Sequence, residues 1–145
     1  MNDDTTRINA VTPKPTHQIT LKIEEEYMLA CASRFRTRGV VASLVTEIAQ
    51  ATIEHQKEKV LVDVRELEGR LGVFDSYYLV TKDFQRLRGK GILKAAIVDR
   101  PLPLMRDWFL ETVSQNRGFN LKIFDNPENG LAWLLGPKNV KGIPV

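Results

Sequence analysis

The fold of this chain is decided by the run Val60-Leu61-Val62-Asp63-Val64 and by two similar runs after it. These are Ala95-Ala96-Ile97-Val98 and Leu121-Lys122-Ile123-Phe124, and a stretch with helical periodicity follows each of the three. Runs of this length that are apolar on both faces are typical of strands buried from both sides, as in a parallel sheet between helices. The three runs therefore predict an α/β domain.

Two further strands are expected before the first of these runs. Residues 19–23 alternate between apolar and polar, which indicates a half-buried strand. A charged turn separates it from a second strand over 27–36, so the two predict an N-terminal β-hairpin. Together with the three apolar runs they predict a mixed, mostly parallel sheet of five strands. Cys31 lies on the face of the second strand that we expect to point inward, which predicts a buried, inert thiol. The opposite face is expected to carry Met28, Ala30, Ala32, Arg34 and Arg36.

About four helices are expected around this sheet, because apolar residues recur at helical spacing in four stretches. The first follows Gly39. The second lies over 73–87 and ends in a left-handed cap at Gly89 or Gly91. The third lies over 101–118, and the fourth begins with Asn126 as N-cap and Pro127 as its first residue.

The length and composition indicate one globular domain. The chain has 145 residues, of which 43% are hydrophobic and 27% charged. Residues 1–16 are polar and interrupted by Pro13 and Pro15, so we expect a disordered or loosely packed leader. The α/β domain is expected over 17–136 and a tail over 137–145.

Several features point to a cytoplasmic protein. The start of the chain is acidic and lacks the apolar stretch of a secretory signal. No apolar run approaches the ~20 residues of a membrane-spanning helix, so no stable membrane insertion is expected. The single Cys31 cannot form an internal disulfide, which is typical of a reducing compartment.

The net charge of +3 is concentrated in one stretch. Between Gly69 and Arg100 there are seven basic and three acidic residues, a local charge of +4. A basic patch is one mark of nucleic-acid binding. No aromatic residues are interleaved for base stacking, however, so we interpret the stretch as a solvated helix face and expect no nucleic acid among the partners.

The predicted order of hairpin and alternating helices and strands resembles the STAS superfamily. Three segments carry the resemblance: Val60–Gly69, Ala95–Asp99, and Ile123–Asn126 running into Leu131-Ala132-Trp133-Leu134. The chain is most similar to bacterial proteins that look like anti-sigma-factor antagonists, a branch often grouped with lipid-binding CRAL-TRIO domains. The resemblance covers roughly residues 17–136. It implies a non-enzymatic regulatory or protein-interaction module.

The chain departs from that family in two places. Anti-sigma-factor antagonists carry a phosphorylatable Ser on the turn after the strand that corresponds to 60–64, whereas here the turn over 68–72 has no hydroxyl. Ser76 is the nearest candidate phosphorylation site, although a serine near a helix start has a capping role of its own. Gly130 stands where we expect Ala, and a glycine inside a helix costs about 0.5–1 kcal/mol.

Catalytic and metal-binding residues are not apparent in the sequence. His17 and His55 lack neighbours at the spacing of metal ligands, so we expect no bound metal and no cofactor. No nucleophile–base pair stands out either, so we do not expect the protein to be an enzyme. Ligands of open α/β sheets bind beyond the carboxyl ends of the strands. Seven polar residues are expected at these ends: Arg65, Glu66, Glu68, Asp99, Arg100, Asp125 and Asn126. They are candidates for a cleft that binds a polar ligand or a partner, and the alternative is that they lie in solvated loops.

Two functions stay open at this point. The first is regulation through contact with a protein partner or with a second copy in a homodimer. Trp108, at the margin of the apolar stripe of the third helix, is a candidate either for that interface or for the core. The alternative is a carrier or sensor of a small apolar or anionic, lipid-like ligand, bound at the carboxyl ends of the parallel strands.

Overall fold

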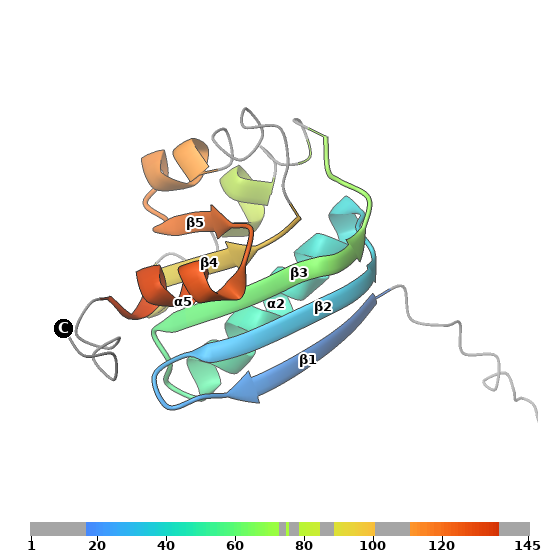
Figure 1. Cartoon of the computed structure of the whole chain (residues 1–145). Helices are drawn as coiled ribbons and strands as arrows, with labels where there is room; N and C mark the ends of the chain where they lie inside the picture. The colour runs from blue at the N-terminus through green and yellow to red at the C-terminus, as the bar shows by residue number, and fades with distance from the viewer. Residues whose placement is uncertain (1–16, 73–74, 76–78, 85–88, 101–110, 137–145) are drawn as a thin grey trace, which may run out of the picture.

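The computed structural model describes residues 17–72, 75, 79–84, 89–100 and 111–136 (Figure 1). The strands are β1 (His17–Ile23), β2 (Met28–Phe35), β3 (Lys59–Glu68), β4 (Lys94–Val98) and β5 (Leu121–Phe124). The helices are α2 (Arg38–Glu54), the π-helix η1 (Leu79–Asp83) and α5 (Pro127–Leu135), and residues 111–116 are also helical.

The five strands form one sheet in the order β1-β2-β3-β4-β5. β1 pairs antiparallel with β2, and every other neighbouring pair is parallel. The mixed, mostly parallel sheet with an N-terminal hairpin is therefore confirmed. The three apolar runs form β3, β4 and β5, as predicted.

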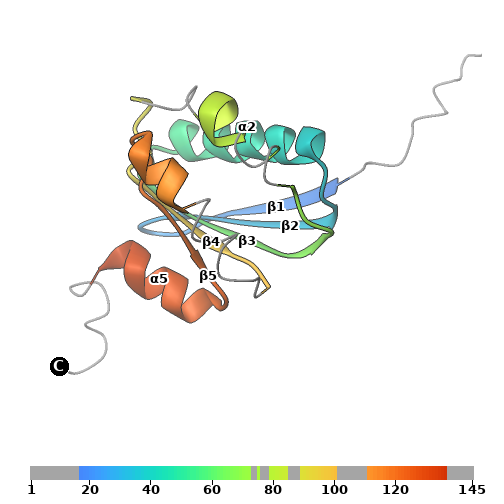
Figure 2. The ribbon, with the colours of Figure 1, turned by 90° about the horizontal axis from the view of Figure 1, so that it is seen from above.

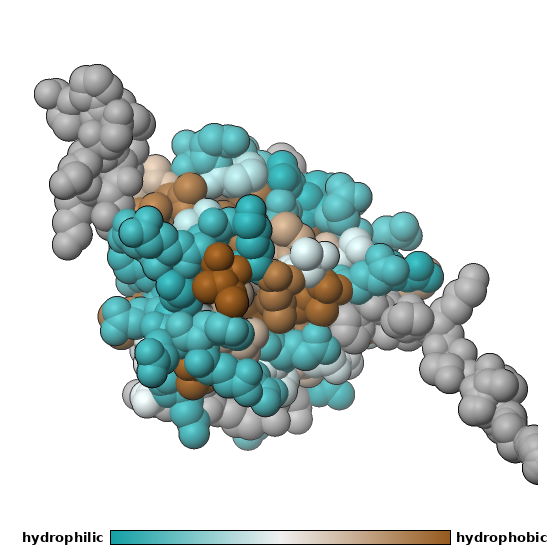
Figure 3. All heavy atoms as spheres, turned by 90° about the horizontal axis from the view of Figure 1, so that it is seen from below, coloured by the Kyte–Doolittle hydropathy of each residue, from teal (hydrophilic) through white to brown (hydrophobic). Residues whose placement is uncertain are grey.

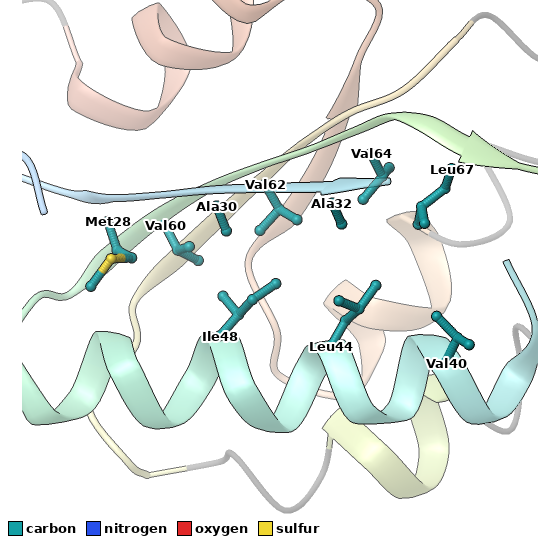
Figure 4. Close-up of a cluster of buried hydrophobic side chains, with 10 residues drawn as sticks. All are labelled: Met28, Ala30, Ala32, Val40, Leu44, Ile48, Val60, Val62, Val64 and Leu67. Carbon is teal, nitrogen blue, oxygen red and sulfur yellow. The ribbon is translucent and has the colours of Figure 1, made fainter. Parts of the chain in front are cut away.

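Helices lie on both faces of the sheet, with α2 on one side and α5 on the other (Figure 2). Thr37 caps the start of α2 by accepting a hydrogen bond from the backbone N of Val40 at 3.1 Å. The apolar stripe of α2 then meets the alternating inward residues of β2 and β3 (Figure 4). This main cluster consists of Met28, Ala30, Ala32, Val40, Leu44, Ile48, Val60, Val62, Val64 and Leu67.

α5 covers β3, β4 and β5 on the opposite face. Asn126 caps it and Pro127 opens it, as predicted. A Cβ at Gly130 would lie 3.2 Å from Cδ1 of Leu61 and 3.4 Å from Cδ1 of Phe124. Glycine therefore stands at this position because α5 approaches the sheet closely, which explains the departure from the expected alanine.

The expectation of a buried Cys31 is wrong. Cys31 is exposed, because it points to the α5 side of the sheet and α5 packs on β3, β4 and β5. Its pKa is nevertheless raised, first by partial burial and then by the charge of Asp63, against a lowering effect of Arg65. A raised pKa leaves less thiolate, so the expectation of low reactivity agrees with this environment.

A register shift changes the faces at the carboxyl end of β3. Cys31 of β2 pairs with Asp63, but Ser33 pairs with Glu66, so β3 carries one extra residue there. Such a bulge reverses the alternation of side chains beyond it. Leu67 is buried as a result, whereas Glu66 is exposed.

The remaining predicted helices fall only partly within the described residues. Of the helix expected over 73–87, η1 is described, and Gly89 and Gly91 after it both have positive φ, as a left-handed cap requires. The helix at 111–116 ends before Gly118, whose φ is 88°. The leader over 1–16, residues 101–110 and the tail over 137–145 lie outside the described residues. None of the described helices has the length and apolar character needed to cross a membrane.

Candidate functional site

Charged side chains gather at the carboxyl ends of β2, β3 and β4. These strands are parallel neighbours, so their carboxyl ends lie at the same edge of the sheet. Arg36 follows β2, Arg70 follows β3, and Asp99 and Arg100 follow β4. These four residues contact one another, and we call them the arginine–aspartate cluster.

Asp99 is the centre of this cluster. Its side chain is 8% exposed, against 10% for Arg36 and 21% for Arg70. Arg36 donates from Nη1 to Oδ2 of Asp99 at 2.8 Å and from Nη2 to Oδ1 at 3.1 Å. Oδ1 also accepts from Nη1 of Arg70 at 2.6 Å and from the backbone N of Arg100 at 2.8 Å. Two largely buried guanidinium groups thus share one carboxylate.

The arginines of the cluster also bind backbone carbonyls near the bulged end of β3. Arg36 donates from Nη2 to the carbonyl oxygen of Val64 at 3.1 Å, and Arg100 donates to that of Leu67 at 2.6 Å. The Nε of Arg36 is buried and has no hydrogen-bond partner within the described part of the chain. A guanidinium carries only N–H donors and no acceptor, so the arginine side chains of the cluster are suited to binding anions.

A separate ion pair lies on the other face of β3. Arg65 donates from Nη2 to Oδ2 of Asp63 at 2.7 Å and from Nε to Oδ1 at 3.0 Å. Burial raises the pKa of Asp63, but the hydrogen bonds and charge of Arg65 outweigh this, so the net pKa is lowered. The pKa of Arg65 is raised, first by its hydrogen bonds to Asp63.

The structure brings together only some of the residues predicted for the cleft. Asp99 and Arg100 belong to the arginine–aspartate cluster. Arg65 is paired elsewhere, and Glu66 and Glu68 are exposed on β3. The five residues therefore do not line a single polar cleft.

The last two predicted cleft residues act at the start of α5. Asn126 accepts through Oδ1 from the backbone N of Asn129 at 2.8 Å, and its Nδ2 donates to Asp125 at 2.9 Å. This is the geometry of a helix cap, which gives both residues a local structural role. Ser76 and Trp108 lie outside the described residues, so the structure does not test either of them.

Arg36 and Arg70 were missed as site residues by sequence reasoning. The three apolar runs predict parallel strands, so the carboxyl-end rule points to the ends of β3, β4 and β5, whereas the sequence predicts β2 only as part of a hairpin. β2 also runs parallel to β3, which brings its carboxyl end to the same edge. Arg70 is one charge of the basic stretch, and its position two residues after the end of β3 was a usable signal.

A cavity of about 180 Å³ extends from the cluster under α2. Arg36, Arg70 and Asp99 line its charged end, and its walls are mostly aliphatic. Ala49 of α2 and Ala95 of β4 contribute only methyl groups, so the space between helix and sheet is incompletely filled.

Comparison with known proteins identifies structural relatives alone. No family model and no curated protein matches the sequence. An anti-sigma factor antagonist from Mycobacterium paratuberculosis is similar in structure, with a TM-score of 0.56 and 10% identity over 87% of this chain and 100% of that one. An uncharacterized DUF3478-family protein with a SpoIIAA-like fold, from Shewanella loihica PV-4, has a TM-score of 0.53 and 20% identity over 85% of this chain and 98% of that one.

Likeness at such low identity establishes a fold. Both structures are matched along nearly their whole length. The five-stranded mixed sheet, the N-terminal hairpin and the helices on both faces agree with this match. The chain is a single α/β domain with the SpoIIAA-like fold, which confirms at the level of the fold the predicted resemblance to anti-sigma-factor antagonists.

Proposed function

We propose that this chain is a non-enzymatic regulatory module that binds another protein along the edge of β1. The observation that carries the proposal is the apolar surface of this edge strand, where Leu21 is 40% and Ile23 51% exposed. Figure 3 views the molecule from the β1 side, with a group of hydrophobic side chains at its centre and hydrophilic ones around it. Within the described residues, no strand pairs with the outer edge of β1.

An edge strand of this kind is a template for protein contact. Its unpaired N–H and C=O groups accept a further strand, and its exposed apolar side chains supply the area to bury. The similarity in fold to an anti-sigma factor antagonist supports a regulatory role of this class. Phosphorylation is not part of the proposal, because the turn over 68–72 has no hydroxyl.

The chemistry of the described residues supports a binding role over catalysis. They contain no group of three or more His, Cys, Asp or Glu side chains arranged to hold a metal. The arginine–aspartate cluster consists of guanidinium donors around one carboxylate, and none of its four side chains is a hydroxyl, a thiol or an imidazole. The proposal includes a cytoplasmic location, where the exposed Cys31 stays reduced.

The test compares charged variants at two exposed sites. Tagged wild-type protein, the double variant Leu21→Lys/Ile23→Lys and the control Leu93→Lys are used to recover partners from cells of the source organism. Leu93 is 57% exposed, lies before β4 and is away from the β1 edge. Its variant therefore makes the same kind of change, an exposed apolar side chain to lysine, at another place on the surface. We expect the double variant to bind the partner at least about tenfold more weakly than the wild type, which corresponds to about 1.4 kcal/mol. The control is expected to bind the partner as the wild type does.

Light scattering on the same three proteins distinguishes a second copy from a different partner. If the wild type is a dimer and the double variant is a monomer, the partner is a second copy of this chain. Equal recovery by wild type and double variant, both folded by circular dichroism, contradicts docking on β1.

A second candidate function is favoured by the cavity under α2. An apolar space with guanidinium groups at one end suits a carrier or sensor of a small ligand. A native mass spectrum of protein purified from its own cells is expected to contain a bound small molecule. A spectrum of the bare chain alone, under conditions that preserve other weak complexes, counts against this second function.

A further inference from the structure

The cavity under α2 combines apolar walls with a charged end. The walls come from elements distant in sequence, including Ile48 of α2, Val62 of β3 and Ile97 of β4. The charged end holds Arg36 and Arg70 together with Asp99. A ligand that fills this space therefore needs both an apolar part and a polar group.

The charged end favours a negative group. Two guanidinium groups face one carboxylate, which leaves a charge of +1 among the charged side chains that line the cavity. Arg100 is not among the lining residues, and its guanidinium binds the carbonyl oxygen of Leu67. Oδ1 of Asp99 already accepts three hydrogen bonds and Oδ2 accepts one. The buried Nε of Arg36, which has no partner in the described part of the chain, is left for another acceptor. A single negative charge would balance the charge of the three charged side chains that line the cavity.

The cavity volume limits the apolar part. A cavity of about 150 Å³ lined by aliphatic and aromatic side chains binds benzene. Pockets for drug-sized ligands are about 300–1,000 Å³, well above the 180 Å³ found here. One ring or a short chain fits this space, whereas a whole membrane lipid does not.

We infer that the cavity binds a small monoanionic carboxylate that carries one apolar ring or short chain. The carboxylate lies against Arg36 and Arg70, and the apolar part lies under α2. A planar carboxylate matches the fork of a guanidinium group, and its single charge balances the excess charge of the end. The inference rests on the second candidate function and specifies the ligand class.

The test uses benzoate as the probe and benzyl alcohol as its neutral counterpart. Methyl resonances of the wild-type protein are followed by NMR during titration with each compound. We expect saturable benzoate shifts at Ile48 and Ile97, which line the cavity, and none at Leu134, a buried residue of α5 on the other face of the sheet. Benzyl alcohol is expected to bind at least about tenfold more weakly.

Three variants assign the two parts of the site. Arg70→Gln is expected to weaken benzoate binding at least about fivefold and to leave benzyl alcohol binding unchanged. The matched control Arg65→Gln removes an arginine that pairs with Asp63 outside the cavity. It should change neither the affinity for benzoate nor that for benzyl alcohol. Ala95→Leu fills the cavity and should abolish both, while circular dichroism and thermal unfolding report that the variant is folded.

Absence of saturable benzoate shifts in the wild type overturns the inference. So does equal affinity for the two compounds, or a loss of benzoate binding in Arg65→Gln as large as in Arg70→Gln. These failures are distinguishable from failure of the underlying function. A neutral small molecule in the native mass spectrum would sustain a ligand-binding function and still exclude the carboxylate class.

Discussion

We expect Asp99→Asn to lower the free energy of unfolding by about 3–5 kcal/mol, the cost of leaving a buried charge without its partner. Asp99 is 8% exposed and accepts four hydrogen bonds, three of them from the guanidinium groups of Arg36 and Arg70. Asparagine keeps one of the two oxygens. Its amide NH2 group replaces Oδ2, so two donors then face each other where Arg36 Nη1 donated a hydrogen bond to Oδ2. At about 1.5–3 kcal/mol per charge-assisted hydrogen bond, losing that bond and the negative charge gives a cost in this range.

The assay is urea unfolding at pH 7 followed by circular dichroism, with an unchanged slope against urea as the sign that the unfolded states are comparable. The control Asp63→Asn removes a carboxylate whose partner Arg65 is 40% exposed, so we expect it to cost no more than about 1 kcal/mol. A cost of Asp99→Asn below about 1 kcal/mol, equal to the control, would refute the reasoning. It would mean that water screens the cluster as it screens a surface ion pair.

Three further predictions concern stability. Gly130→Ala is expected to lower the free energy of unfolding by about 1 kcal/mol despite the better helix propensity of alanine, because its Cβ would press on Leu61 at 3.2 Å; a gain in urea unfolding experiments would contradict this packing. Arg34→Gly is expected to raise the melting temperature, because Arg34 has a φ of 92°, which glycine adopts without strain; an unchanged or lower value would show that its side chain contributes more than the strain costs. The folded-state pKa of Asp63 is lowered, so its ionised form stabilises the fold above the unfolded-state pKa of ~3.9, and this contribution is lost as the pH falls through the folded-state value. The stability difference between wild type and Asp63→Asn, measured by urea unfolding at neutral and at strongly acidic pH, should therefore shrink in acid, and a difference that stays constant would argue against the pair with Arg65.

The elements of this fold could be predicted from the sequence because their signals are local. A buried strand needs a short run that is apolar on both faces, and such runs identify β3, β4 and β5. The start of α5 depends on two adjacent residues, Asn126 as the cap and Pro127 after it. Each of these signals acts within a few residues, so it could be recognised without knowing the neighbours in space.

The site depended on contacts between elements far apart in the chain. Alternation separates the two faces of β2, but only the position of α5 over β3, β4 and β5 leaves Cys31 exposed. Arg36 reaches Asp99, 63 positions later, because β2 lies parallel to β3 and both end at the edge where β4 ends. The cavity likewise reflects the combined volume of side chains from helix and sheet, where Ala49 and Ala95 leave space. Pairing direction and packed volume are properties of several segments together, so only the tertiary structure decided them.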